Sequence, residues 1–178
     1  IRSAYVMTEP QVASSDATNL ELSITPDGDH YVLNGRKWWI SNAMHPRCTI
    51  WIVMGKTDFD APRHAQHSQI LVEPDTPGIT IVRHLTVFGS HNSPGGECEL
   101  RFDNVRVPAA NLVGTPNRGW DMAKALLSFE RIYLGSPRLS AYAFSRLKQL
   151  AERMGVWEDA VFQDTYAKLR LDLEDLKS

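Results

Sequence analysis

Residues 20–40 read LELSITPDGDHYVLNGRKWWI, a stretch in which short apolar–polar alternations are separated by turn-forming residues. The alternation of Leu20, Leu22 and Ile24 with polar residues predicts a half-buried strand. The sequence PDGD at 26–29 predicts a tight turn after that strand, because proline fixes φ and glycine readily takes a positive φ. These features together predict a strand that reverses direction and continues as a second strand.

The pair Asn34-Gly35 predicts another reversal in the same stretch. Asparagine followed by glycine is the strongest short hairpin signal, because a type I′ turn requires positive φ at both central positions. We therefore expect residues 36–40 to pair with residues 31–33. Further short strands are predicted at 49–54, 69–72, 79–82 and 98–102. Many short strands separated by turns favour an antiparallel β-barrel or sandwich.

A helical pattern begins after Pro116. Residues 120–134 lack glycine and proline and place apolar residues at helical spacing, which predicts a helix. The sequence GSP at 135–137 should interrupt that helix, because proline lacks a backbone donor and clashes with the preceding turn. Helix should resume over 141–153 and end at Gly155.

A last helix is predicted over 158–177. Its apolar residues recur every three or four positions, so they lie on one face. They are Phe162, Tyr166, Leu169, Leu173 and Leu176. A stripe this regular requires a packing partner, either within the chain or outside it. The predicted fold class is therefore α+β, a β-barrel or sandwich domain followed by long helices.

The composition is that of an ordinary globular protein, with 178 residues, 43% of them hydrophobic and 22% charged. A net charge of −2 argues against nucleic acid or an anionic membrane as a partner. No apolar run approaches the ~18 residues that a membrane span requires. Cys48 and Cys98 form no Cys-x-x-Cys motif, which favours free thiols in a reducing compartment. Because residue 1 is isoleucine, we expect the chain to be an excerpt of a longer protein.

Four sequence blocks carry the first functional signal. They are YVMTEPQVASSD at 5–16, NGRKWWISN at 34–42, FDNVRVP and NLVG within 102–114, and GW at 119–120 with FER at 129–131. In this order and spacing they resemble the acyl-CoA dehydrogenase family, flavoenzymes that desaturate acyl-CoA thioesters. The resemblance implies a middle β domain at 1–115, followed at 116–178 by the first long helices of an α-helical bundle domain.

The resemblance implies that FAD is the cofactor. The residues implied to contact it are Tyr5, Val6, Met7, Thr8, Ser15, Trp39, Ile40 and Ser41. Trp39 would pack beside the isoalloxazine ring, and the hydroxyls of Thr8 and Ser41 would approach its polar edge. The alternative for these hydroxyls is a bond to the local backbone. Trp38 should face the opposite side of the strand and be structural.

The resemblance also implies that a carboxylate removes the α proton of the substrate, while its β hydrogen leaves as a hydride to the flavin. Glu130 directly precedes Arg131 and so matches the base of some branches of the family, whereas other branches take the base from a later loop. The alternative for Glu130 is a place on a solvated or ion-paired helix face. Ser15, Ser128 and Arg131 are the implied substrate contacts.

The implied partners are an acyl-CoA of fatty-acid β-oxidation, an electron-transfer flavoprotein and further copies of the chain in a dimer or tetramer. The implied location is the cytoplasm, or the mitochondrial matrix in a eukaryote. The family's Arg-x-x-Phe-Gly element, which holds the FAD diphosphate, is not evident, since ERMG at 152–155 lacks the phenylalanine. Two alternatives therefore stay open. One is a non-catalytic paralogue or partner subunit that binds CoA esters or stabilises a heteromer, and the other is an acyl-CoA oxidase.

No metal site is expected from the sequence. His64 and His67 offer two imidazoles in a polar loop. A zinc site requires three or four converging protein ligands, and no further ligand stands at a suitable spacing.

Overall fold

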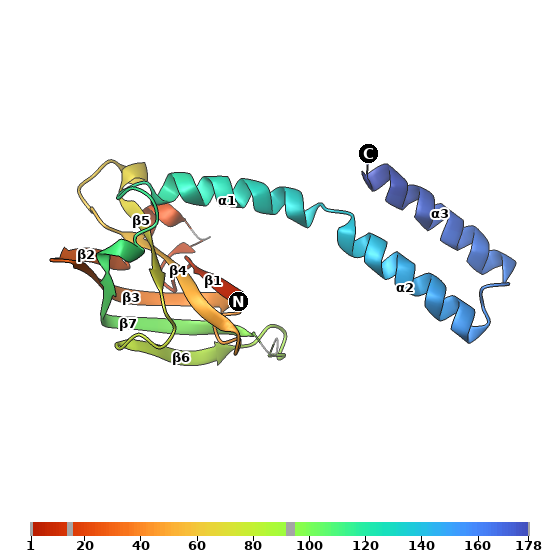
Figure 1. The fold of residues 1–178 in the computed structure, drawn as a ribbon, viewed down its shortest axis with the longest axis horizontal. Coiled ribbons are helices and arrows are strands. Elements are labelled where there is room, and N and C mark those ends of the chain that lie inside the picture. The colour runs from red at the N-terminus through yellow and green to blue at the C-terminus, as the bar shows by residue number, and fades with distance from the viewer. Residues whose placement is uncertain (1, 14–15, 92–94, 178) are drawn as a thin grey trace. The chain divides into compact units, whose positions relative to one another are not determined.

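The computed structural model describes residues 2–13, 16–91 and 95–177. The chain divides into two compact units, Ile1–Lys124 and Ala125–Ser178. The strands belong to the first unit, and most of the helical residues belong to the second (Figure 1). The domain boundary expected between residues 115 and 116 stays a prediction.

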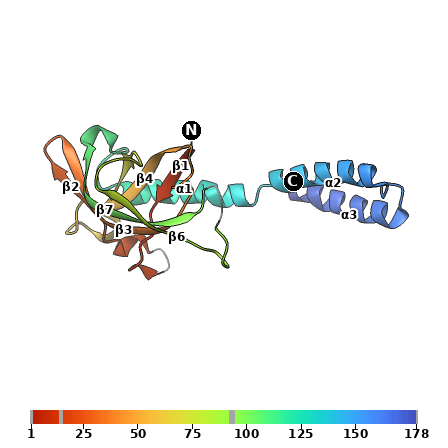
Figure 2. The same ribbon diagram turned by 90° about the horizontal axis from the view of Figure 1, so that it is seen from below.

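A seven-stranded sheet forms most of the first unit. Its strands are β1 (Arg2–Val6), β2 (Ser23–Asp27), β3 (His30–Ser41), β4 (Cys48–Lys56), β5 (His67–Val72), β6 (Ile79–Leu85) and β7 (Glu97–Pro108). The order along the sheet is β1-β4-β2-β3-β7-β6, with β5 paired to β4. The sheet curls into a half-barrel (Figure 2), so the predicted fold class is confirmed.

The sheet is mixed and not wholly antiparallel. Both β1 and β2 run parallel to β4, whereas the other pairs are antiparallel. The predicted interior strand is confirmed, because β4 has β1, β2 and β5 as neighbours. The expectation of a purely antiparallel sheet was wrong, because turn signals report only on strands that are joined by hairpins.

The pair Asn34-Gly35 is not a turn, and this prediction was wrong. Both residues lie inside β3, which is continuous over 30–41, and the reversal between β2 and β3 occurs at 28–29. Gly35 serves a different purpose, because a Cβ atom here would lie 2.8 Å from the Cα of Leu22. The Asn-Gly signal is local, whereas the close approach of another segment makes the glycine necessary here.

Two apolar clusters form the interior of the first unit. The main core includes Leu22, Ile24, Leu33, Trp51, Val53, Ile70, Phe102 and Val105. The second core consists of Val12, Ala17, Leu20, Met54 and Ala123, with Met7 and Trp120 packed against it. Burial of a leucine-sized side chain stabilises a protein by roughly 1.5–3 kcal/mol. The second core therefore holds the segment after β1 against β4 and the first turn of the following helix.

Three long helices follow the sheet, α1 (Gly119–Leu134), α2 (Arg138–Met154) and α3 (Ala160–Lys177). The interruption at 135–137 is confirmed. The end of α2 at Gly155 is also confirmed, and this residue has a φ of 70°. Glycine takes this conformation readily because it has no Cβ. Within the described residues, no helix is long and apolar enough to cross a membrane.

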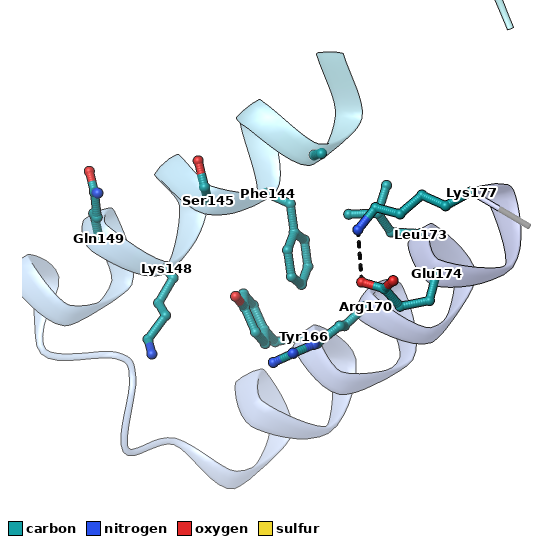
Figure 3. A pocket seen from close by; sticks show the side chains of 10 residues that line it. Phe144, Ser145, Lys148, Gln149, Tyr166, Arg170, Leu173, Glu174 and Lys177 are labelled. Atoms are coloured by element: carbon teal, nitrogen blue, oxygen red, sulfur yellow. Dashed lines mark hydrogen bonds and ion pairs between the residues drawn. The ribbon is translucent and has the colours of Figure 1, made fainter. Parts of the chain in front are cut away.

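Aromatic rings join α2 and α3 into a hairpin. Phe144 of α2 stacks on Tyr166 of α3 with ring centroids 4.1 Å apart, and Figure 3 shows these two rings facing each other beside a pocket. Leu173, from the predicted stripe, is buried in the same hairpin. Leu169 and Leu176 remain 46% and 55% exposed. The stripe therefore has a partner in α2 over only part of its length.

We expect Gly35→Ala to lower the free energy of unfolding by about 2–3 kcal/mol, because the added methyl meets the Leu22 backbone and overpacks the core. Gly28→Ala is the matched control. Gly28 also has a positive φ, of 63°, but no atom of another described residue lies within 4 Å of its Cβ position, so about 1 kcal/mol should be lost. Urea unfolding of the full-length protein measures both values. Equal losses in the two variants would contradict the close approach at Gly35.

Candidate functional site

A buried ion pair connects the segment after β1 to the middle of β3. The Nζ atom of Lys37 lies 2.8 Å from Oε1 of Glu9, and the two side chains are 0% and 1% exposed. Lys37 also donates to the carbonyl oxygen of Met7 at 2.7 Å. The carboxylate of Glu9 accepts from the backbone N–H groups of Glu21, at 2.6 Å, and Leu22, at 3.0 Å. These buried contacts of Lys37 with Met7 and Glu9 therefore hold residues 7–9 against β3.

The charges of this pair depend on each other. Burial lowers the pKa of Lys37 to about 8, and the negative charge of Glu9 opposes that shift. Lys37 therefore stays mostly protonated at pH 7. Either charge alone would be strongly unfavourable in this dry environment. The segment can leave β3 only if both charges are exposed to water or one is left without its partner.

A β-bulge interrupts β3 at the two tryptophans. The register between β3 and β7 shifts between Lys37 and Ile40, so two residues of β3 face one residue of β7. Trp39 has a φ of 54°, which is unfavourable for a bulky residue. Its side chain is 43% exposed. The bulge therefore presents an aromatic ring outside the core in a strained backbone conformation.

The bulge also changes the orientation of Trp38. Its ring centroid lies 6.2 Å from that of Trp39, with 57° between the ring planes. Two neighbouring residues of a regular strand would point to opposite faces. The prediction that Trp38 faces the other side was therefore wrong, because the bulge breaks the alternation of the strand.

Thr8 lies directly beside this bulge. The backbone N–H of Trp38 donates to the carbonyl oxygen of Thr8 at 3.0 Å. The hydroxyl of Thr8 in turn donates to the carbonyl oxygen of Trp38. This is a bond to the backbone, as the alternative interpretation expected, yet the hydroxyl oxygen can still accept another bond. Two predicted cofactor residues, Thr8 and Trp39, are thus brought together.

The other predicted cofactor residues have different surroundings. The side chains of Val6 and Ile40 belong to the main core and are 0% and 2% exposed. Their side chains are therefore part of the packing of the sheet and do not face an open site. Met7 packs against the second core, and Ser41 is exposed at the end of β3. Ser15 lies outside the described residues.

Tyr5 is engaged with protein groups. Its hydroxyl accepts a hydrogen bond from Nε2 of Gln69 at 2.8 Å and lies 3.7 Å from the sulfur of Met54. Burial raises the pKa of Tyr5 to about 12, and the bond from Gln69 acts in the opposite direction. The phenol is therefore neutral at physiological pH. The same Nε2 atom of Gln69 donates to the carbonyl oxygen of Gly119, at 3.0 Å.

Sequence reasoning missed Glu9, Lys37 and Gln69 as site residues. One signal was available for Lys37, which stands an even number of residues from Leu33 in the same strand. Even spacing places a side chain on the same face as the buried leucine. No comparable pattern marks Glu9 or Gln69, because their roles depend on residues far away in the sequence.

The predicted catalytic and substrate residues Ser128, Glu130 and Arg131 are exposed on α1. All three belong to the second compact unit. Their roles stay predictions.

The described residues contain no group of three or more His, Cys, Asp or Glu side chains that could hold a metal ion. The ring of His64 stacks on Trp120 with a centroid distance of 6.0 Å. His67 is instead buried at the start of β5. Cys48 and Cys98 are both free and buried.

His67 is a buried imidazole, and among the residues that the structure describes neither of its ring nitrogens has a hydrogen bond of normal geometry. Burial lowers its pKa to about 4, and the nearby charge of Lys56 contributes to the same shift. The backbone of Ala17 acts in the opposite direction. The imidazole is therefore neutral at pH 7.

The sequence of this chain matches a known family model over residues 4–105, and that model describes the middle domain of acyl-CoA dehydrogenases. The matched range covers all or part of each of the seven strands, and it includes Thr8, Trp39 and the Lys37–Glu9 pair. The chain belongs to the acyl-CoA dehydrogenase family.

Individual relatives agree with this assignment. Acyl-CoA dehydrogenase family member 10 of Mus musculus is 53% identical over 133 residues, which cover 75% of this chain and 12% of that protein. Acyl-CoA dehydrogenase family member 11 of Mus musculus is 41% identical over 186 residues, which cover 99% of this chain and 24% of that protein. The crystal structure of acyl-CoA dehydrogenase from Geobacillus kaustophilus is 31% identical with a TM-score of 0.74, covering 97% of this chain and 46% of that one. The chain thus spans less than half the length of each.

We expect Lys37→Met to lower the free energy of unfolding by about 3–5 kcal/mol, because it leaves the carboxylate of Glu9 buried without its partner. Adding Glu9→Gln should recover part of this loss, because a neutral amide oxygen still accepts from the backbone N–H groups. The exposed ion pair of Lys168 with Asp164 supplies the control. Lys168→Met should change stability by less than about 0.5 kcal/mol. A double variant no more stable than Lys37→Met would contradict the buried-charge explanation.

The folded state should lose stability in mild acid through His67. The unfolded chain binds a proton near the ordinary pKa of 6.5, whereas the folded state resists protonation until about pH 4. Stability therefore falls by roughly 2–3 kcal/mol as the pH drops through this window.

Denaturant unfolding between pH 7 and pH 4 measures this loss. His67→Leu should remove this part of the pH dependence. His84→Leu removes an exposed imidazole that is not among the groups acting on the pKa of His67, so it should keep the parental profile. An unchanged profile in His67→Leu would assign the acid sensitivity to other groups.

Proposed function

We propose that residues 1–115 form the middle β domain, and residues 116–178 the first helices of the helical domain, of a flavin-dependent acyl-CoA dehydrogenase. The proposed reaction forms a double bond between the α and β carbons of an acyl-CoA thioester. The observation that carries the proposal is the exposed ring of Trp39, held at a positive φ beside Thr8. A strained, exposed aromatic residue has no evident structural benefit, and such strain is typical of ligand sites.

The residues around the bulge fit the isoalloxazine group of FAD. A flavin needs an aromatic surface and polar groups along its edge. Trp39 supplies the aromatic surface, and the backbone of 6–8 with the hydroxyls of Thr8 and Ser41 supplies the polar edge. The Lys37–Glu9 pair keeps that edge in place. FAD, when bound, supplies the acceptor for a hydride.

Glu130 is the proposed base. An α proton beside a thioester carbonyl is weakly acidic, so its removal requires a positioned carboxylate. The carboxylate of Glu130 would take this proton, and Ser15, Ser128 and Arg131 would contact the acyl-CoA. The alternative origin of the base is a later loop of the helical domain, in which case Glu130 belongs to a solvated or ion-paired helix face.

The wider assignment follows from the same proposal. Electrons would pass to an electron-transfer flavoprotein, in fatty-acid β-oxidation in the cytoplasm or the mitochondrial matrix. A homodimer or homotetramer is supported by exposed apolar side chains on α2 and α3, such as Leu139, Leu150 and Leu171. An acyl-CoA oxidase would share these residues and differ in its access to oxygen.

A second candidate is a non-catalytic relative that binds CoA esters or stabilises a heteromer. The sequence ERMG at 152–155 favours it, because the family's Arg-x-x-Phe-Gly element is not evident there. The presence of Thr8, Trp39 and Ser41 argues against it.

The test is the absorption spectrum of the full-length protein, purified with its flavin and mixed with a panel of acyl-CoA esters under anaerobic conditions. Loss of the visible flavin absorption (bleaching) on addition of one ester supports the proposed dehydrogenase activity. A colourless protein that rejects added FAD would overturn the proposal and favour the non-catalytic relative.

Glu130→Gln should slow this bleaching by at least about 100-fold, because the amide cannot take a proton. Glu158→Gln changes another exposed glutamate in the helical region and serves as the control. Bleaching at the parental rate in Glu130→Gln would place the base elsewhere.

A further inference from the structure

β5 begins with three consecutive buried polar residues. His67, Ser68 and Gln69 are 1%, 0% and 5% exposed. Consecutive residues of a strand point to opposite faces, so both faces of β5 are covered here. The segment that leads into α1 lies against this part of β5, because the N–H of Val113 donates to the carbonyl oxygen of Gln69 at 2.9 Å. The N–H of Asn117 donates to Oγ of Ser68 at 2.8 Å.

The first residue of α1 lies on the backbone of the same strand. A Cβ atom at Gly119 would meet the carbonyl carbon of Ser68 at 2.8 Å and the carbonyl oxygen of His67 at 2.9 Å. Only a residue without a side chain fits at this separation. The start of α1 is therefore set by direct contact with β5.

The amide of Gln69 joins this helix start to β1. Its Nε2 atom donates to the Tyr5 hydroxyl at 2.8 Å and to the Gly119 carbonyl oxygen at 3.0 Å. An amide NH₂ carries two hydrogens, so these two bonds use its full donor capacity. The bridge connects residues that are 64 and 50 positions from Gln69 in the sequence.

The second core reinforces the same connection. Met7 and Trp120 both pack against it, one just after β1 and the other in the first turn of α1. Met54 belongs to this cluster, and its sulfur lies 3.7 Å from the Tyr5 hydroxyl. The polar bridge and the apolar contacts thus act on the same two segments.

We propose that Gln69 is a positioning residue that fixes the flavin-facing segment 5–8 against the start of α1. This inference rests on the proposed function, because it assigns segment 5–8 to the flavin. Gln69 does not touch the cofactor in this proposal. It acts through Tyr5, to whose hydroxyl it donates, and through Gly119 at the start of α1.

The test compares FAD binding by the parental full-length protein, Gln69→Met, Tyr5→Phe and the double variant. Methionine keeps the length of the side chain and removes both hydrogen bonds. Gln69→Met should raise the Kd for FAD about tenfold and shift the visible flavin bands, because one buried bridge is lost. The double variant should be no more than about twofold weaker than Gln69→Met, since both changes remove the same bond.

Asn111→Leu is the matched control. Nδ2 of Asn111 donates to the carbonyl oxygen of Leu71 at 3.1 Å. This bond also joins a side-chain amide to β5, but its acceptor belongs to β5 and it does not link β1 with α1. This variant should leave the Kd for FAD within about twofold of the parent, whatever its effect on stability. If the Gln69→Met variant binds FAD with the affinity and the flavin spectrum of the parent, the proposal is overturned.

Amide hydrogen exchange gives a readout that needs no flavin. Gln69→Met should speed exchange in both 5–8 and 119–123, whereas Asn111→Leu should not. If the parental protein binds no FAD, the proposed function fails and exchange alone decides the role of Gln69. Unchanged exchange in both segments in Gln69→Met would overturn the role.

Discussion

The buried ion pair between Lys37 and Glu9 is the interaction on which the candidate site depends. Moving either charge out of water is expensive, and the attraction between them offsets that penalty only while they remain in contact. The pair therefore gives segment 7–9 a single position on β3. From that position Thr8 exchanges hydrogen bonds with Trp38. The exposed part of the candidate site therefore depends on the position of segment 7–9 against β3.

The bulge in β3 then produces the exposed aromatic surface. A positive φ at a tryptophan costs on the order of 1–3 kcal/mol and persists only where the surrounding structure enforces it. Lys37 and Ile40, on either side of the bulge, are 0% and 2% exposed, so both flanks of the strained residue are fixed in the interior. Trp39, between them, is both strained and exposed. Both features lower the stability of the fold, so a domain selected only for stability would not keep them.

Local patterns predicted the helices better than the connections within the sheet. The interruption at 135–137 and the end of α2 at Gly155 depend on the chemistry of single residues, and both are confirmed. The Asn34-Gly35 hairpin was wrong because Leu22, from another segment, makes the glycine necessary. In the site, the sequence blocks pointed to Thr8 and Trp39 but not to Gln69, whose partners are remote in sequence.

The order of residues alone was enough for the positions of most strands and helices and for membership of the acyl-CoA dehydrogenase family. These properties depend on short-range periodicity and on contiguous motifs, which can be recognised without knowing which residues become neighbours in the fold. Folding in three dimensions settled which charge meets Lys37, which hydroxyl meets Gln69 and which of two adjacent tryptophans is strained. Glu9 and Lys37 are 28 positions apart, and Tyr5 and Gln69 are 64 apart. Such partners become neighbours only when strands pair, and no local pattern records which strands those will be.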